Sequence, residues 1–90
     1  MASYKVYAVI IKQSVAKDLR AIPNVDVRRI LDRIESLAAN PRGEACVKLA
    51  GQDRYRVRQG LYRIVYEIHD DRLVVIVVKI GHRASVYETR

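Results

Sequence analysis

The sequence lacks most of the features that define disulfide-rich, membrane-spanning and metal-binding proteins. Its single cysteine, Cys46, excludes a disulfide within the chain. The longest apolar run, Leu73 to Val78, ends at Lys79 and is far shorter than the roughly 20 residues of a membrane-spanning helix. Two histidines and one distant cysteine form no recognised metal site. We therefore expect no membrane insertion, no metal and no cofactor.

The sequence also has no low-complexity tract and no internal repeat. Its 90 residues are 50% hydrophobic, which suits one compact domain near the size at which burial only just offsets chain entropy. We expect a single domain over residues 1–90. No apolar segment follows a charged start, as it does in a secretory signal, so a cytoplasmic protein is expected.

Positive charge is what the sequence has in excess. The 17 Lys and Arg residues against 10 Asp and Glu give a net charge of +7, which favours an anionic partner such as nucleic acid, an acidic protein or a membrane surface. The excess is concentrated in residues 48–63, where five basic residues face one acidic residue. Residues 64–78 carry three acidic residues and one basic residue.

The first half of the chain predicts one strand and two helices. Tyr4 to Ile11 is rich in β-branched and aromatic residues, as a strand is. Ser14 can cap a short helix that runs to about Ala21 and is stopped by Pro23. A longer helix is predicted by apolar residues at helical spacing: Val27, Ile30, Leu31, Ile34, Leu37 and Ala38. Asn24, followed by acidic Asp26, can cap this helix.

The second half changes to the alternating period of strands. Three strands are expected over residues 55–58, 62–68 and 73–80, joined by links tight enough for antiparallel hairpins. The last strand is apolar at nearly every position, which favours a central place in the sheet. The order predicts an α+β fold with the helices on one sheet face, Tyr62 and Tyr66 toward them, and the arginines on the other.

Several short motifs occur in an order that resembles one protein family. They are N-P-R at residues 40–42, K-L-x-G at 48–51, Y-R-V-R at 55–58, Y-R-I-V-Y-E-I at 62–68 and G-H-R-x₂-V-Y at 81–87. Together they resemble the RelE/ParE superfamily of small bacterial toxins, and within it the RelE-type messenger-RNA endoribonucleases that act on the ribosome. The resemblance covers nearly the whole chain and implies the RelE-like α+β fold.

The resemblance also implies a chemistry. RelE-type enzymes use metal-independent attack of a ribose 2′-hydroxyl on the adjacent phosphate of mRNA in the ribosomal A site. Such a reaction needs a proton acceptor, positive charge for the phosphorane, and a proton donor for the leaving 5′-oxygen. Arg56 and Arg58 match basic positions that are lysines in the family. Because arginine has a pKa above about 12, they suit phosphate binding better than proton abstraction.

The other site residues are carried over by position. Arg63 matches the main transition-state arginine of the family, Arg83 the second arginine, and Tyr87 the tyrosine that stacks on a nucleotide base. His82 offers an acid or base. The expected catalytic set is therefore Arg56, Arg58, Arg63, His82, Arg83 and Tyr87, and the expected RNA-binding set is Lys48, Arg54, Arg56, Arg58 and Lys79.

Simpler structural roles compete with these assignments. Arg56 and Arg58 also suit a solvated edge strand that resists aggregation. Arg63 either pairs with Glu67 or points into a functional groove. His82 fits a solvated loop, and Tyr87 fits a hydrophobic tether. Ala50 stands where well-known family members have an arginine, so one phosphate contact is missing unless Lys48 replaces it.

The leading hypothesis is a toxin that cuts mRNA on the ribosome and is neutralised by a RelB-like antitoxin. The resemblance implies a heterotetramer or larger toxin–antitoxin complex on operator DNA, with the antitoxin as the DNA reader. The alternative is a ParE-like DNA gyrase inhibitor without nuclease activity, which shares the fold. A toxin that has lost its activity and survives as a binding partner is a third hypothesis, which Ala50 keeps open.

Overall fold

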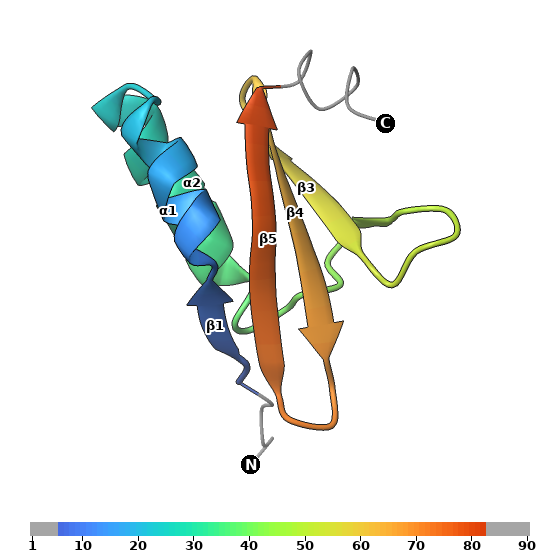
Figure 1. Ribbon diagram of the computed structural model, residues 1–90. Helices are drawn as coiled ribbons and strands as arrows, with labels where there is room; N and C mark the ends of the chain where they lie inside the picture. The colour runs from blue at the N-terminus through green and yellow to red at the C-terminus, as the bar shows by residue number, and fades with distance from the viewer. Residues whose placement is uncertain (1–5, 83–90) are drawn as a thin grey trace.

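One mixed five-stranded sheet carries two helices on one face (Figure 1). The computed structural model describes residues 6–82. The elements in chain order are β1 (Ala8–Ile11), α1 (Gln13–Arg20), α2 (Asn24–Ser36), β2 (Val47–Lys48), β3 (Tyr55–Gln59), β4 (Tyr62–His69) and β5 (Val74–His82). The predicted α+β fold with a C-terminal antiparallel meander is confirmed. The short strand β2 was not predicted, because two residues carry too little alternation to be recognised.

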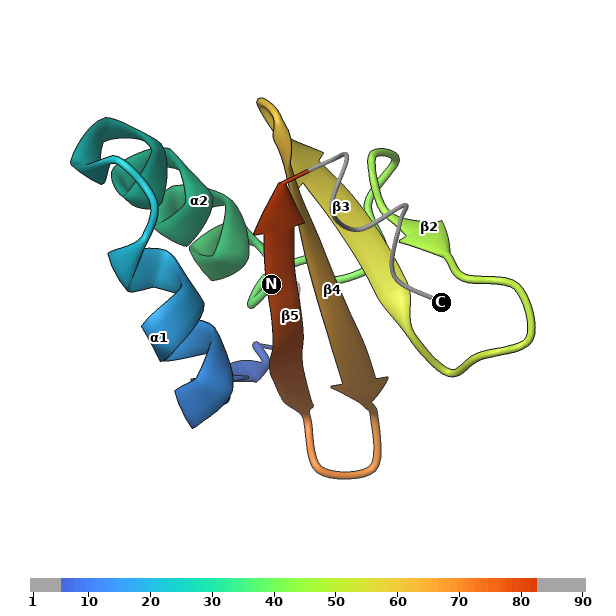
Figure 2. The ribbon, with the colours of Figure 1, turned by 45° about the horizontal axis from the view of Figure 1, so that its top comes forward.

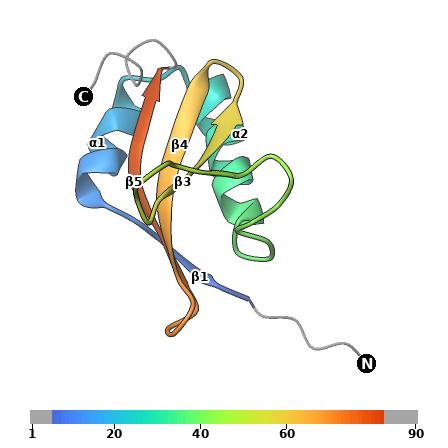
Figure 3. The ribbon, with the colours of Figure 1, turned by 90° about the vertical axis from the view of Figure 1, so that its right-hand side faces the viewer.

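The strand order is β1-β5-β4-β3-β2. β1 pairs with β5 in parallel, and every other pair is antiparallel. The apolar strand β5 has a neighbour on each side, as its composition predicts, although β4 is the central strand. Figure 2 shows α1 and α2 on the same side of the sheet, and Figure 3 shows them behind the strands.

The hydrophobic core lies between the helices and this face of the sheet. Tyr66 is its largest fully buried side chain, so the prediction that Tyr66 and the half-buried Tyr62 lie toward the helices is confirmed. The helical contribution comes from positions three or four residues apart, which is the spacing of one helix face. The main members of the core are Val15, Ile30, Ile34, Leu37, Val57, Ile64, Tyr66, Val75, Val77 and Ile80.

The predicted helix caps are wrong by one or two residues. Lys12, not Ser14, is the N-cap of α1, and no side chain caps it. Its carbonyl accepts bonds from the N–H groups of Val15 and Ala16, so the helix begins where the parallel strand ends. Pro23, not Asn24, is the N-cap of α2, since its ψ of 141° suits the extended backbone of that position.

Two hairpins order the meander. Gly60 and Leu61 link β3 to β4, and Gly60 takes a φ of +60° that favours glycine. Residues 70–73 link β4 to β5, where Leu73 has a φ of 52°. Both predicted hairpins are confirmed, with turns one or two residues later than expected. Between residues 6 and 82, no helix is long and apolar enough to cross a membrane.

Candidate functional site

Basic side chains gather on the sheet face opposite the helices. Residues paired across antiparallel strands point to the same side of a sheet, so the register identifies the members. Two cross-strand rows form this area, Arg58–Arg63–Gly81 and Arg56–Val65–Lys79. We call Arg56, Arg58, Arg63 and Lys79 the basic face. The prediction that helices and arginines lie on opposite faces holds for these residues.

A β-bulge in β5 decides on which side Lys79 lies. Val65 pairs with Lys79 but Tyr66 pairs with Val77, so Val78 is an extra residue on β5. Strict alternation would place Lys79 beside buried Val77 in the core. The extra residue reverses the alternation beyond it. Lys79 is therefore exposed, and Ile80 points into the core. Nothing in the sequence pattern of β5 signals this bulge.

Arg63 is the only buried charged residue among those described, with 5% of its surface exposed. It lies in register with Arg58 on one side and Gly81 on the other. Like charges at directly opposed sheet positions are destabilising, and burial of charge is costly in itself. A buried arginine in register with a second arginine is therefore a candidate for a functional role.

Glu67 lies further along the same face and is occupied by other partners. Arg54 Nε donates to its Oε2 at 3.2 Å, and His69 Nε2 lies 3.1 Å from its Oε1. The contact with His69, followed by that with Arg54, lowers the pKa of Glu67, although desolvation acts in the opposite direction. The Glu67 carboxylate is therefore engaged by Arg54 and His69.

The remaining predicted residues are distributed unevenly. Arg54 continues the arginine column of β3 but is ion-paired with Glu67. Lys48 pairs in register with Tyr55 and lines a separate hollow of about 480 Å³ with Arg42 and Asp70. It is not brought together with the basic face. His82 is exposed at the end of β5, and its ring packs edge-on against Tyr62 with centroids 5.7 Å apart. Arg83 and Tyr87 lie outside the described residues.

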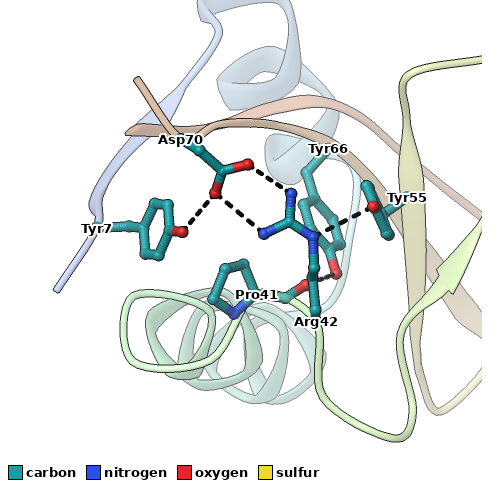
Figure 4. A network of polar contacts seen from close by, with 6 residues as sticks. All are labelled: Tyr7, Pro41, Arg42, Tyr55, Tyr66 and Asp70. Carbon is teal, nitrogen blue, oxygen red and sulfur yellow. Dashed lines mark hydrogen bonds and ion pairs between the residues drawn. The ribbon is translucent and has the colours of Figure 1, made fainter. Parts of the chain in front are cut away.

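A network of polar contacts gives the N-P-R motif a structural role (Figure 4). Arg42 donates to both carboxylate oxygens of Asp70, at 3.0 and 2.7 Å, and the Tyr7 hydroxyl donates to the same carboxylate at 2.6 Å. The bond to Asp70 raises the pKa of the Tyr7 hydroxyl. These contacts tie the loop after α2 to the β4–β5 hairpin and to the start of β1.

Two tyrosines complete this network. The Tyr66 hydroxyl donates to the Pro41 carbonyl at 2.6 Å, and burial raises the pKa of that hydroxyl. The Tyr55 ring stacks on Tyr66 with centroids 5.9 Å apart, and the Arg42 guanidinium lies 5.5 Å from the Tyr55 centroid. We call Tyr7, Pro41, Arg42, Tyr55, Tyr66 and Asp70 the tyrosine–aspartate network. In the sequence only the N-P-R motif points to this network, because the other members come from distant parts of the chain.

The basic face can bind consecutive phosphates of an extended strand. Its three arginines stand on paired strands, which hold their backbones at fixed separations. Guanidinium groups suit phosphate because they present several donors in a plane. Lys79 is a side chain of this face that can exchange a proton, whereas His82 pairs in register with Tyr62 and lies on the helix side of the sheet. The arrangement suits electrostatic stabilisation of a pentacovalent phosphate better than metal-type chemistry.

Comparison with known proteins agrees with this fold. A family model described as the ParE toxin of the type II toxin–antitoxin system parDE matches residues 9–87. A protein of Methanocaldococcus jannaschii named as toxin RelE1 is 33% identical over 82 residues, which are 87% of this chain and 91% of that protein. The chain is therefore a type II toxin–antitoxin system toxin. It belongs to the RelE/ParE superfamily, with RelE-like relatives.

Solved structures give the same assignment. The RelE–RelB complex of Pyrococcus horikoshii contains a chain with a TM-score of 0.79 and 31% identity, with 87% of this chain and 96% of that chain covered. The RelBE2 toxin–antitoxin complex of Mycobacterium tuberculosis gives a TM-score of 0.80 at 22% identity, with coverages of 93% and 99%. The second likeness shows the fold alone, and the RelE-like fold expected from the motifs is confirmed.

Proposed function

We propose that this toxin is a metal-independent endoribonuclease that cuts mRNA in the ribosomal A site. The observation that carries the proposal is the buried Arg63, placed in register with Arg58 and flanked by Arg56 and Lys79. Concentrated positive charge on stiff strands is suited to the extra negative charge that a phosphate gains in the transition state. The RelE-like relatives support the same class of activity.

Each residue has a defined task in this reaction. The ribose 2′-oxygen attacks phosphorus, a 2′,3′-cyclic phosphate forms, and the bond to the 5′-oxygen breaks. Arg63 stabilises the charge that develops on the phosphate oxygens, and Arg56 and Arg58 hold the backbone in place. His82 does not suit the proton transfer expected of it, because it pairs in register with Tyr62 on the helix side of the sheet. Arg83 and Tyr87 are assigned as second arginine and base-stacking group by resemblance.

The proposed partners follow from charge and from the relatives. Ribosomal RNA and mRNA supply phosphate, so binding should weaken steeply as salt is raised. The solved relatives from P. horikoshii and M. tuberculosis are toxins in complex with RelB-type antitoxins. We propose that a RelB-like antitoxin neutralises this chain, and that the resulting heterotetramer or larger complex binds operator DNA through the antitoxin.

The test is cleavage in a reconstituted translation system. Messenger-RNA ends are mapped by primer extension with wild-type protein, with Arg63→Ala and with ribosomes omitted. The matched control is Arg28→Ala, which removes an exposed arginine from α2 on the helical side. Cuts within the A-site codon are expected only with ribosomes, and Arg63→Ala should slow them about 100-fold or more. Intact mRNA with folded wild-type protein would sink the nuclease proposal.

A second candidate function is inhibition of DNA gyrase. One observation favours it: the family model that matches residues 9–87 is described as a ParE toxin. Such a toxin acts by protein contact and needs no buried arginine on the open sheet face. Gyrase-dependent DNA cleavage, measured with the same wild-type and Arg63→Ala proteins, separates the two. A gyrase effect that is unchanged by Arg63→Ala, together with intact mRNA, would favour the second candidate.

A further inference from the structure

Most side chains of the basic face are poor proton donors, although the proposed cleavage needs a proton for the leaving 5′-oxygen. Arg56, Arg58 and Arg63 carry guanidinium groups, which hold their protons up to a pH above about 12. A lysine ammonium gives up a proton more readily, since the ordinary pKa of lysine is about 10.4. The remaining member of this face is Lys79.

The β-bulge at Val78 places Lys79 close to the reaction centre proposed at Arg63. Lys79 pairs with Val65, and Gly81 pairs with Arg63, two residues earlier on β4. Lys79 and Arg63 are therefore diagonal neighbours on one sheet face, with backbones about 7–8 Å apart, which two long side chains can bridge. Gly81 adds no side chain beside Arg63.

Arg56 lies across Val65 from Lys79, in the same cross-strand row. Neighbouring strands are about 4.8 Å apart, so the backbones of Arg56 and Lys79 are separated by about 10 Å. A phosphate held by Arg56 and Arg63 therefore has Lys79 on its other side. The attacking and leaving oxygens of an in-line displacement also lie on opposite sides of phosphorus, so Lys79 stands where the leaving oxygen can be reached.

The Lys79 side chain is exposed and available to a ligand. Within residues 6–82, no hydrogen bond or ion pair engages its ammonium group. Glu67 and His69 on the same face can also exchange a proton, but they lie further along β4 and contact each other at 3.1 Å. Of these three groups, Lys79 is the one beside the arginines.

We propose that Lys79 donates the proton to the leaving 5′-oxygen, an inference that rests on the proposed nuclease function. The ribose 2′-oxygen forms the new bond to phosphorus, and its proton passes to a solvent water. The bond from phosphorus to the 5′-oxygen breaks with its electron pair left on that oxygen, which takes a proton from the Lys79 ammonium. The lysine amine then regains a proton from solvent, so no proton is gained or lost overall.

Substitution of Lys79 is the first test. Single-turnover cleavage of a short synthetic mRNA on ribosomes is measured for wild type, Lys79→Gln and Lys79→Arg. Both variants should be slower by about 100-fold, because arginine keeps the charge but holds its proton too tightly. The control Lys17→Gln, on exposed α1, should stay within about twofold of wild type. A wild-type rate for Lys79→Arg would show that only charge is required and would overturn proton donation.

A changed leaving group separates proton transfer from phosphate binding. The 5′-oxygen at the cut is replaced by sulfur, which leaves as a thiolate without a proton because a thiol is a far stronger acid than an alcohol. Lys79→Gln should then cleave within about threefold of wild type, since the step that it impairs is no longer needed. A defect that persists with sulfur would show that Lys79 only binds phosphate or supports the fold, and would overturn the proposal.

The same measurements distinguish this inference from the proposed function. Wild-type protein that cuts the oxygen mRNA, together with Lys79→Gln at an unchanged rate, overturns the role of Lys79 alone. Folded wild-type protein that cuts neither mRNA on ribosomes overturns the nuclease function and this inference with it.

Discussion

Arg42 and Arg63 lie against the same sheet, but their environments are opposite. The Arg42 side chain is 45% exposed and forms a two-pronged ion pair with Asp70. Arg63 is 5% exposed and lies in register with another arginine, Arg58. In the tyrosine–aspartate network each charge has a matched neighbour that joins distant segments. On the basic face arginines stand in register with one another on β3 and β4, so this face is the candidate binding surface and the network is a structural one.

The largest expected effect separates the two regions by activity. Changing Arg56 and Arg58 together to glutamine removes two phosphate contacts from the basic face. The rate of mRNA cleavage should fall about 100-fold or more, and the thermal unfolding temperature shows that the variant is still folded at the assay temperature. The rate is measured in the reconstituted translation system, and unfolding by circular dichroism.

The matched control for this pair removes the same charge from the helical side. Arg20→Gln with Arg28→Gln changes two exposed residues of α1 and α2. Its cleavage rate should stay within about threefold of wild type, since only long-range attraction to RNA is reduced. An equal loss in both double variants would show that net charge, not the basic face, determines activity.

The second effect concerns stability alone. Tyr66→Phe removes the buried hydroxyl that donates to the Pro41 carbonyl at 2.6 Å. An unsatisfied buried acceptor costs about 1–2 kcal/mol, which lowers the unfolding temperature of a domain of this size by roughly 5–10 °C. Scanning calorimetry measures the change. Cleavage well below the unfolding temperature should be preserved.

Tyr55→Phe is the control, because it removes the same group from a more exposed bond to Arg42 of 3.3 Å. Its cost should be below about 0.5 kcal/mol. Equal losses in the two variants would contradict the importance of the buried bond.

The third effect depends on pH and concerns Glu67, which borders the basic face. Its folded pKa is lowered from the ordinary value of 4.5, first by His69. The stability that this group contributes is therefore present above the unfolded pKa and is lost as pH falls through the folded one. Glu67→Gln should cost about 0.5–1 kcal/mol at neutral pH, and the difference from wild type should shrink below pH 4.5. Urea unfolding at several pH values measures it, and a difference independent of pH would refute the assignment.

The contrast between the regions also explains what the sequence could predict. Alternation and helical spacing are local properties, so β3, β4, β5 and both helices follow from residues close in the chain. The basic face follows in part, since Arg56, Arg58 and Arg63 alternate with apolar neighbours. The side of Lys79 does not, because it depends on a bulge against β4.

Long-range contacts were beyond sequence reasoning for a physical reason. The hydrogen-bonded residues Tyr7 and Asp70 are 63 positions apart in the sequence, and Arg42 and Asp70 are 28 positions apart. Nothing local marks them as neighbours before the parallel β1–β5 pair forms. The separation of Lys48 from the arginines has a similar origin, since its register on the short strand β2 places it with Tyr55.

The smallest expected effect tests whether like charge costs stability on β3. Arg56→Gln removes a charge whose neighbours on the same face, Arg54 and Arg58, are also arginines. The free energy of unfolding should rise by about 0.2–0.5 kcal/mol at low salt. The gain should vanish near 1 M salt, where the screening length falls to about 3 Å.

Arg54→Gln, two residues away on the same chain, makes the same chemical change but breaks the 3.2 Å pair with Glu67. It should lower stability by a similar amount at low salt. Opposite signs for two identical substitutions, measured by urea unfolding, would show that pairing rather than residue type decides whether an arginine stabilises this sheet. If both variants lose stability, the apolar part of the Arg56 side chain contributes more by packing than its charge costs.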